Sequence, residues 1–213
     1  MCGRYALHSL IQDLQQHFGV FGGPSFSPSY NIPPSTSLPI VRTSTEGEEL
    51  CLCQWGFVPH WMKSFPATRP INARSETVAT KPYFRSAFRH HRCLVPANGY
   101  YEWQRAGKVK QPWYISLKDQ DLFAFAGLWD TWNGPDGALQ TFTILTTTAN
   151  SATAAIHDRM PVILPPTRYR DWLAGGDTEL LQPYGGEMNT WPVSRLVNSP
   201  ANDKPELIQR QPD

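Results

Sequence analysis

Proline limits the architecture of this chain more than any other residue type. Twenty of the 213 residues are proline, close to twice the usual share of about 5%. Because proline fixes φ and has no backbone N–H, it interrupts helix interiors and central strands. We therefore expect a loop-rich protein with short strands and few long helices. The chain is long enough for one domain that buries roughly 70% of its unfolded surface.

Strand-like runs dominate the hydrophobic pattern. They cover residues 37–43, 49–55, 93–96, 99–105, 112–118, 122–129 and 139–147. Short helices are expected at 9–19, 81–91, 150–157 and 166–174. In the first helix Ser9 and Gln12 resemble a capping box, and Gly19 is placed to end it. These patterns predict an α+β fold: a single, mostly β domain over residues 1–213, with a polar tail that is loose from about residue 200.

Several classes of protein do not fit this sequence. The longest apolar run, 122–129, is far too short to span a membrane, and the first 25 residues lack the apolar core of a signal peptide. Four cysteines do not form a disulfide framework. Neither Cys51 with Cys53 nor the 90–93 segment HHRC has a second ligand pair at zinc-site spacing. We expect an intracellular, cytoplasmic protein with no metal or other cofactor and no membrane partner.

Positive charge is concentrated in one segment. Residues 61–92 hold seven basic side chains and a single acid, Glu76, for a net charge of +6, whereas the rest of the chain has 12 bases and 17 acids. This asymmetry fits a polyanion bound on one face, although a solvated helix face would have the same composition. The aromatic segment 54–62 leads into it. Trp55 and Phe57 suit a core, whereas Trp61, between His60 and Lys63, suits a surface platform for unpaired bases.

Four polar residues and the second residue of the chain are candidates for chemistry. Asn72 and Arg74 would share one face of an extended segment, and Glu102 lies within the aromatic run NGYYEWQ, where desolvation would raise its pKa. His157 stands where a predicted helix gives way to an apolar strand. A lone Glu or His is more often structural, so the four residues together with a terminal aminothiol make a better candidate than any one of them.

Cys2 would become the N-terminal residue after removal of Met1. An N-terminal cysteine carries an α-amine and a thiol on adjacent carbons, a 1,2-aminothiol that no internal residue offers. The alternative is a buried cysteine near a disordered terminus.

A set of motifs along the chain resembles the SOS-response-associated peptidase (SRAP) family of abasic-site processing proteins. The matching segments, in the family's order, are CGRY (2–5), YNIPP (30–34), QWGFVPHW (54–61), INARSE (71–76), CLVPANGYYEW (93–103), FAGLW (125–129), TILTTTAN (143–150), IHDRMPVIL (156–164) and WPVSRLVN (191–198). Two features depart from the family. Met62 stands where an aromatic often follows Trp61, and the segment before INARSE looks longer, so contacts near 62–70 transfer least safely.

The resemblance implies that the protein senses abasic sites in single-stranded DNA, captures them covalently through Cys2 and shields the lesion during the DNA damage response. It implies that Asn72 positions the terminal residue, that Glu102 assists sugar ring opening, and that His157 shuttles protons. The implied DNA contacts are Arg4, Arg74, Lys81 and Arg159 to phosphates, Thr146 in the site, and Pro34, Trp61 and Met62 as wedges against bases. Such wedges favour a single strand or a junction with duplex. We expect a monomer.

The aminothiol gives this activity an independent chemical reason. An α-amine of pKa roughly 7.7–8.0 is about one-third neutral at pH 7.5, whereas a lysine near 10.4 is neutral about one part in a thousand. The amine can form a Schiff base with the ring-opened sugar, and the thiol can close a thiazolidine. While Met1 is present the amine is an amide, and this chemistry is blocked. Two alternatives remain: an N-terminal-nucleophile cysteine peptidase that removes its own Met1, and a non-catalytic reader of modified or single-stranded DNA.

Overall fold

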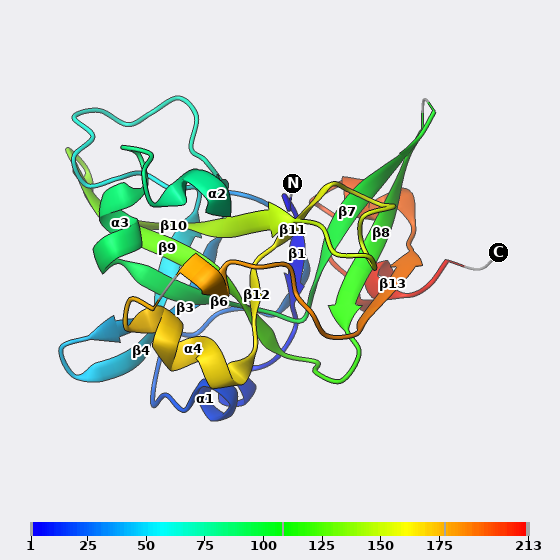
Figure 1. Cartoon of the computed structure of the whole chain (residues 1–213), viewed down its shortest axis with the longest axis horizontal. Helices are drawn as coiled ribbons and strands as arrows, with labels where there is room; N and C mark the ends of the chain where they lie inside the picture. Colours follow the sequence, from blue (N-terminus) through cyan, green and yellow to red (C-terminus); the bar gives the residue numbers. More distant parts are fainter. Residues whose placement is uncertain (1, 108, 177, 212–213) are drawn as a thin grey trace.

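Two β-sheets lie side by side in the protein (Figure 1). The computed structural model describes residues 2–107, 109–176 and 178–211. The smaller sheet has the order β13-β8-β7-β1-β2, and all its pairings are antiparallel. Its strands are β1 (Tyr5–Leu7), β2 (Ser29–Ile32), β7 (Gly99–Ala106), β8 (Val109–Leu117) and β13 (Met188–Pro192).

The larger sheet closes into a barrel. The pairings run β10-β4-β3-β6-β9, and β9 pairs with β10 again, so that five strands form a ring. These strands are β3 (Ser37–Ser44), β4 (Gly47–Trp55), β6 (Arg92–Ala97), β9 (Phe123–Gly134) and β10 (Gly137–Thr148). Three short strands extend the ring: β5 (Asn72–Arg74) and β11 (Arg159–Pro161) on β10, and β12 (Ile163–Leu164) on β9. The prediction of a mostly β, α+β fold is confirmed, and each of the seven predicted strands is present.

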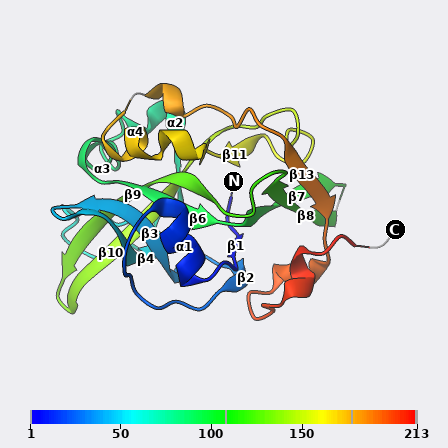
Figure 2. The same ribbon diagram turned by 90° about the horizontal axis from the view of Figure 1, so that it is seen from below.

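The helices are short and pack outside the barrel (Figures 1 and 2). They are α1 (Ile11–Phe18), α2 (Ser75–Val78), α3 (Arg85–His90) and α4 (Tyr169–Leu173), with 3-10 turns at Pro166–Arg168, Thr178–Leu180, Arg195–Asn198 and Pro205–Ile208. The helix predicted at 166–174 is present as a 3-10 turn followed by α4. The one predicted at 81–91 is shorter, because residues 82–84 form a turn before α3.

Two helix predictions need correction, and side-chain hydrogen bonds explain both. Ser9 does not cap α1: its N–H and Oγ both bond to Asn98, so the helix begins one residue later, where the Leu10 N–H donates to Asp13 Oδ2 at 2.8 Å. Gly19 ends the helix as expected, at φ 67°. The segment 150–157 is not a helix. Asn150 Oδ1 accepts from the N–H and hydroxyl of Thr153, which holds a series of turns instead.

The polar tail is not loose from residue 200, because it packs on the smaller sheet as far as Gln211 (Figure 2). Asn31 Nδ2 donates to the carbonyl of Asn202 at 2.7 Å, and Leu207 is buried in a cluster behind the smaller sheet. Trp191 Nε1 donates to the carbonyl of Ile208 at 2.9 Å. The apolar Leu207 and Ile208 anchor a segment whose other residues are mostly polar.

Two classes of feature are absent from the described part of the chain. None of its helices is long and apolar enough to cross a membrane. Among the same residues, no group of three or more His, Cys, Asp or Glu side chains is arranged to hold a metal ion.

Gly127 provides a test of barrel packing. It lies on β9 between Cys93 of β6 and Ile144 of β10. A Cβ added there would approach Cys93 Sγ and Val95 Cγ2 to 2.8 Å, so Gly127→Ala should destabilise the fold by about 1–3 kcal/mol. Gly185→Ala, whose added Cβ would meet nothing within 4 Å, is the control. Equal midpoints for both variants in chemical denaturation would contradict the close packing.

Candidate functional site

Cys2 lies where the two sheets meet, because it precedes β1 of the smaller sheet and is hydrogen-bonded to β5 of the larger one. Its side chain is fully buried, and the thiol donates to the carbonyl of Arg4 at 3.9 Å. Asn72 Nδ2, at the start of β5, donates to the Cys2 carbonyl at 2.8 Å. Burial, followed by the charge of Glu102, holds the pKa of the Cys2 thiol well above its usual range. Cys2 is therefore fixed in place and predominantly a thiol at neutral pH.

The local fold explains why Asn72 reaches Cys2. The Ile71 carbonyl accepts from Trp55 Nε1 at 2.9 Å and from the Ile144 N–H at 3.1 Å. These bonds place β5 parallel to β10, with Asn72 opposite Ile144. Asn72 Oδ1 is buried and has no hydrogen-bond partner among the described residues, so it remains available as an acceptor.

Glu102 is the buried carboxyl of the site. It lies on β7 opposite Trp113 and is only 3% exposed. Burial raises its pKa to about 7, against a smaller opposing effect of the Trp103 N–H that bonds to it. A carboxyl with this pKa exists in both protonation states near neutrality, as general acid–base chemistry requires. The sequence-based expectation of a desolvated Glu102 is confirmed.

His157 follows the turns of residues 150–156 and is half-buried. Its Nδ1 accepts the backbone N–H of Arg159 at 3.0 Å and lies 2.9 Å from Asp158 Oδ1. Burial lowers the pKa of His157, while the nearby Asp158 acts in the opposite direction. The ring is therefore predominantly neutral at pH 7 and can accept a proton.

Arg159 belongs to a network beside these residues. Its guanidinium pairs with Glu76 of α2, and its Nη2 donates to the Thr146 carbonyl at 2.6 Å. Thr146 is buried on β10 opposite Arg74, and its hydroxyl lies 3.5 Å from the Ala73 carbonyl. The structure thus brings Arg159 and Thr146 together. Glu76 is the partner of Arg159, whereas in the sequence it stands out only as the one acid in a basic segment.

Two tyrosines next to Cys2 were also missed. Tyr5 of β1 and Tyr100 of β7 are directly opposite each other, and both are fully buried. Neither hydroxyl has a hydrogen-bond partner among the described residues. Burial, and then the proximity of Cys2, raises the pKa of each. Aromatic residues in strands are typical of a core, and the position of these two beside Cys2 is visible only in the structure.

The remaining predicted contacts are spread over the surface around this centre. Arg74 and Lys81 are exposed, Arg74 directly before α2 and Lys81 in the segment between α2 and α3. Arg4 is half-buried, and its Nη1 donates to Asn31 Oδ1 at 2.7 Å and to the Val197 carbonyl at 3.0 Å. Those bonds give Arg4 a structural role in addition to the predicted contact with phosphate.

The three predicted wedge residues lie on loops. Pro34 is half-buried and precedes Ser35, whose φ of 70° is unusual for a residue with a side chain. Trp61, 48% exposed, and the half-buried Met62 belong to the long loop between β4 and β5. Trp55 and Phe57 are fully buried, so the division between core and surface aromatics was predicted correctly.

Comparisons with known proteins agree on one family. Residues 1–200 match the family model described as SOS response associated peptidase (SRAP). The chain is 41% identical to abasic site processing protein YoqW of Bacillus subtilis, over 98% of this chain and 99% of the relative. It is 30% identical to YedK of Escherichia coli over 98% and 99% of the two chains, and 32% identical to HMCES of Xenopus tropicalis over 86% and 66%. Both carry the same descriptive name.

A solved structure shows the same fold. A crystal structure of a protein from Bacteroides thetaiotaomicron superimposes with a TM-score of 0.89 at 29% identity, over 99% of this chain and 100% of the other.

The raised pKa of Glu102 predicts a stability test. The unfolded chain ionises this carboxyl near pH 4.5 and the folded chain near pH 7, so folding binds a proton between these values and stability falls as pH rises through them. Glu102→Gln removes this loss. We expect the variant to be more stable than the wild type at pH 8, by up to about 3 kcal/mol, and equally stable at pH 4.

Thermal melts of both proteins at the two pH values measure this difference, and effects of other titrating groups cancel in the comparison. A Gln variant that is less stable at pH 8 would contradict the desolvated carboxyl.

Proposed function

The chain belongs to the SRAP family, and from this premise we propose that it processes abasic sites in DNA by covalent capture through Cys2. The observation that carries the proposal is the bond from Asn72 to the Cys2 carbonyl, beside a buried Glu102 whose pKa lies near 7. A terminus with no chemical role has no need of a fixed carbonyl and an adjacent desolvated acid. The names of the related proteins support the same substrate.

The covalent step uses both groups of Cys2 after Met1 has been removed. The α-amine adds to the aldehyde carbon of the ring-opened sugar, and the carbinolamine loses water to give an imine. The Cys2 sulfur then bonds to the imine carbon, the C=N electron pair moves to nitrogen, and that nitrogen gains the proton that sulfur loses. The net change is loss of one water, with no oxidation or reduction.

Glu102 and His157 supply the proton transfers in this scheme. A protonated Glu102 can donate to the sugar oxygen during ring opening and to the leaving water. Its carboxylate can then accept the thiol proton, which the buried Cys2 does not release unaided. His157, neutral at pH 7, serves as a second base. Asn72 Oδ1 is an available acceptor for the terminal amine or a sugar hydroxyl.

The DNA contacts surround this centre in the proposal. Arg74 and Lys81, both exposed, contact phosphates, as does Arg159 once a phosphate replaces Glu76 on its guanidinium. Pro34, Trp61 and Met62 wedge against bases, which favours a single strand or a junction with duplex. Arg4 and Thr146 complete the site, Arg4 through the part of its guanidinium not bound to Asn31. We propose that the protein acts as a monomer.

Peptidase chemistry is proposed only for the removal of Met1. A thiol that is fully buried and has a raised pKa is a poor nucleophile toward external peptides. Mass spectrometry of the protein mixed with an abasic-site oligonucleotide separates the possibilities. A stable adduct supports capture, peptide turnover supports a general peptidase, and reversible binding alone supports a non-catalytic reader.

Cys2→Ala should abolish the stable adduct and leave affinity for abasic single strands within a few-fold of wild type. The alanine variant keeps the terminal amine but cannot close a ring, so its imine remains hydrolysable. Denaturing gels for the adduct and fluorescence anisotropy for binding measure the two effects. Cys93→Ala, which removes a buried thiol outside the site, is the control. A long-lived adduct with Cys2→Ala would rule out the aminothiol mechanism.

Glu102→Gln should slow cross-linking by about 10²-fold, because an amide keeps hydrogen bonds but exchanges no proton. His157→Ala should instead change the pH profile, removing an acid limb that lies below the usual histidine range, since the pKa of His157 is lowered. Single-turnover cross-linking rates across pH, with melting temperatures for each variant, measure both. If each variant reacts at the wild-type rate across the range, the two residues are structural.

A further inference from the structure

A cationic pocket lies on the barrel side of the molecule, outside the site around Cys2. The cavity measures about 570 Å³, and among its lining residues are His60, Trp61, Arg85, Arg89 and His90. No carboxylate is among the lining residues of the described chain. Arg85 and Arg89 are four residues apart on α3, which places both guanidinium groups on the same helix face. The pocket therefore combines positive charge with one large aromatic side chain.

The charges of this pocket are not neutralised within the protein. Arg85 and Arg89 are exposed, and neither forms an ion pair or a side-chain hydrogen bond with any described residue. The nearby carboxylate of Asp130 faces inward and is only 2% exposed. It accepts the His60 N–H at 2.9 Å and lies 2.8 Å from His60 Nδ1 and 3.3 Å from His91 Nδ1. Asp130 thus orients His60 from behind the pocket and is not itself one of the lining residues.

Buried aromatic residues support the walls of the pocket. Phe84 and Phe88 are buried and hold α3 against the barrel, which leaves Arg85 and Arg89 facing outward. The Trp61 ring packs edge-on against Tyr83, with centroids 6.0 Å apart, and the Tyr83 hydroxyl donates to the Phe57 carbonyl at 3.3 Å. Half of Trp61 nevertheless remains exposed. A preformed site of this kind needs little reorganisation to bind a ligand.

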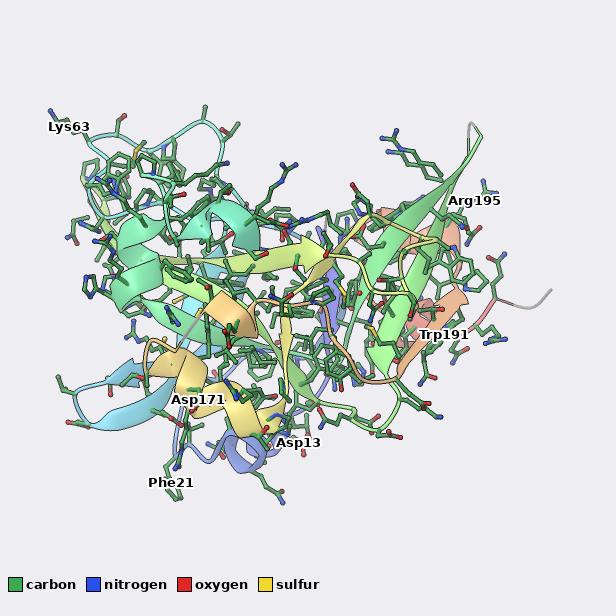
Figure 3. All side chains as sticks on the ribbon, in the orientation of Figure 1. Asp13, Phe21, Lys63, Asp171, Trp191 and Arg195 are labelled. Carbon is green, nitrogen blue, oxygen red and sulfur yellow. The ribbon has the colours of Figure 1, made fainter. Side chains whose placement is uncertain are left out.

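The pocket is continuous with the proposed DNA path. The Lys81 carbonyl accepts the Arg85 N–H at 2.9 Å. Lys81, a proposed phosphate contact, is therefore directly adjacent to the start of α3. Arg74 precedes α2, Lys81 lies between α2 and α3, and Arg85 and Arg89 are on α3; the two helices are neighbours in Figure 1. Lys63, in the same loop as Trp61, lies at this end of the molecule, and Arg195 lies at the opposite end (Figure 3).

We propose that this pocket is a second phosphate-binding subsite, which holds the backbone of the DNA strand on one side of the lesion while Trp61 stacks on an unpaired base. The inference rests on the proposed function and extends its footprint. Guanidinium groups recognise phosphate oxygens through paired N–H donors, and an exposed aromatic beside them suits a nucleobase better than an acidic peptide. Only one flank of the lesion can lie over α3. The affinity should therefore depend on the length of the strand on that side alone.

The test compares abasic single strands whose flank is extended on the 5′ side or on the 3′ side. In each series the flank is lengthened from a minimal length to about ten nucleotides. This length is within the number of nucleotides that one single-strand binding surface covers. The variant is Arg85→Gln with Arg89→Gln, because glutamine keeps length and helix propensity while removing charge. Arg195→Gln, an exposed arginine at the opposite end, is the matched control. Affinity is measured by anisotropy at several salt concentrations, with melting temperatures to verify folding.

We expect extension on one side to tighten wild-type binding at least ten-fold, and the double variant to lose this gain. The slope of log affinity against log salt should fall by about 1.4 for the long strand, or roughly 0.7 for each lost phosphate contact. The minimal strand should bind and cross-link equally with wild type, variant and control. An equal loss on both flanks, an unchanged salt slope, or an effect as large with Arg195→Gln would overturn the subsite. If the minimal strand is not captured by the wild type, the proposed function itself fails.

Discussion

The position of Cys2 depends on β1, a strand of three residues that is paired on both edges. Tyr5 lies opposite Tyr100 of β7 on one side and Ile32 of β2 on the other. The Tyr101 N–H donates to the Arg4 carbonyl at 3.0 Å, which extends the pairing toward the terminus. A terminus would ordinarily fray. Here the paired strand and the hydrogen bond from Asn72 together fix the position of Cys2 at the junction of the smaller sheet and the barrel.

Several polar groups around Cys2 share a second property, which is burial at a cost in stability. The Tyr5 and Tyr100 hydroxyls and Asn72 Oδ1 have no described partner, and Glu102 ionises only near pH 7. A buried polar atom without a partner costs about 1–3 kcal/mol, so these residues reduce the stability of the fold. Such costs are typical of sites in which polar groups are preorganised for a reacting molecule. Stability and chemistry are therefore opposed at Glu102, where the same burial lowers stability and adjusts its pKa.

The sequence predicted the strands that correspond to long runs of strand-like residues. Runs of eight or more residues, such as 122–129 and 139–147, correspond to β9 and β10. Strands of three residues, such as β1 and β5, carry no periodic pattern, because their form comes from partners distant in sequence. The segment 150–157 misled because its apolar alanines suit a helix, whereas the side chains of Asn150 and Thr153 stabilise turns.

The candidate site was predictable in a different way. The desolvation of Glu102 followed from its aromatic neighbours, and the exposure of Trp61 followed from the basic residues beside it. The grouping of Asn72 with Cys2 came from the family resemblance and not from any local pattern, since Asn72 is in the larger sheet and Cys2 precedes a strand of the smaller one. The pairing of Glu76 with Arg159 joins residues 83 positions apart and was visible only in the structure.

The central claim is that the amine and the thiol of Cys2 both bond to one sugar carbon. Peptide mapping of the adduct by tandem mass spectrometry, with and without borohydride added after cross-linking, tests it most directly. A thiazolidine has no C=N bond to reduce, so we predict a modified peptide that begins at Cys2 and has the same mass under both conditions. An adduct that gains two hydrogens on reduction, or that maps to a lysine, would contradict the account.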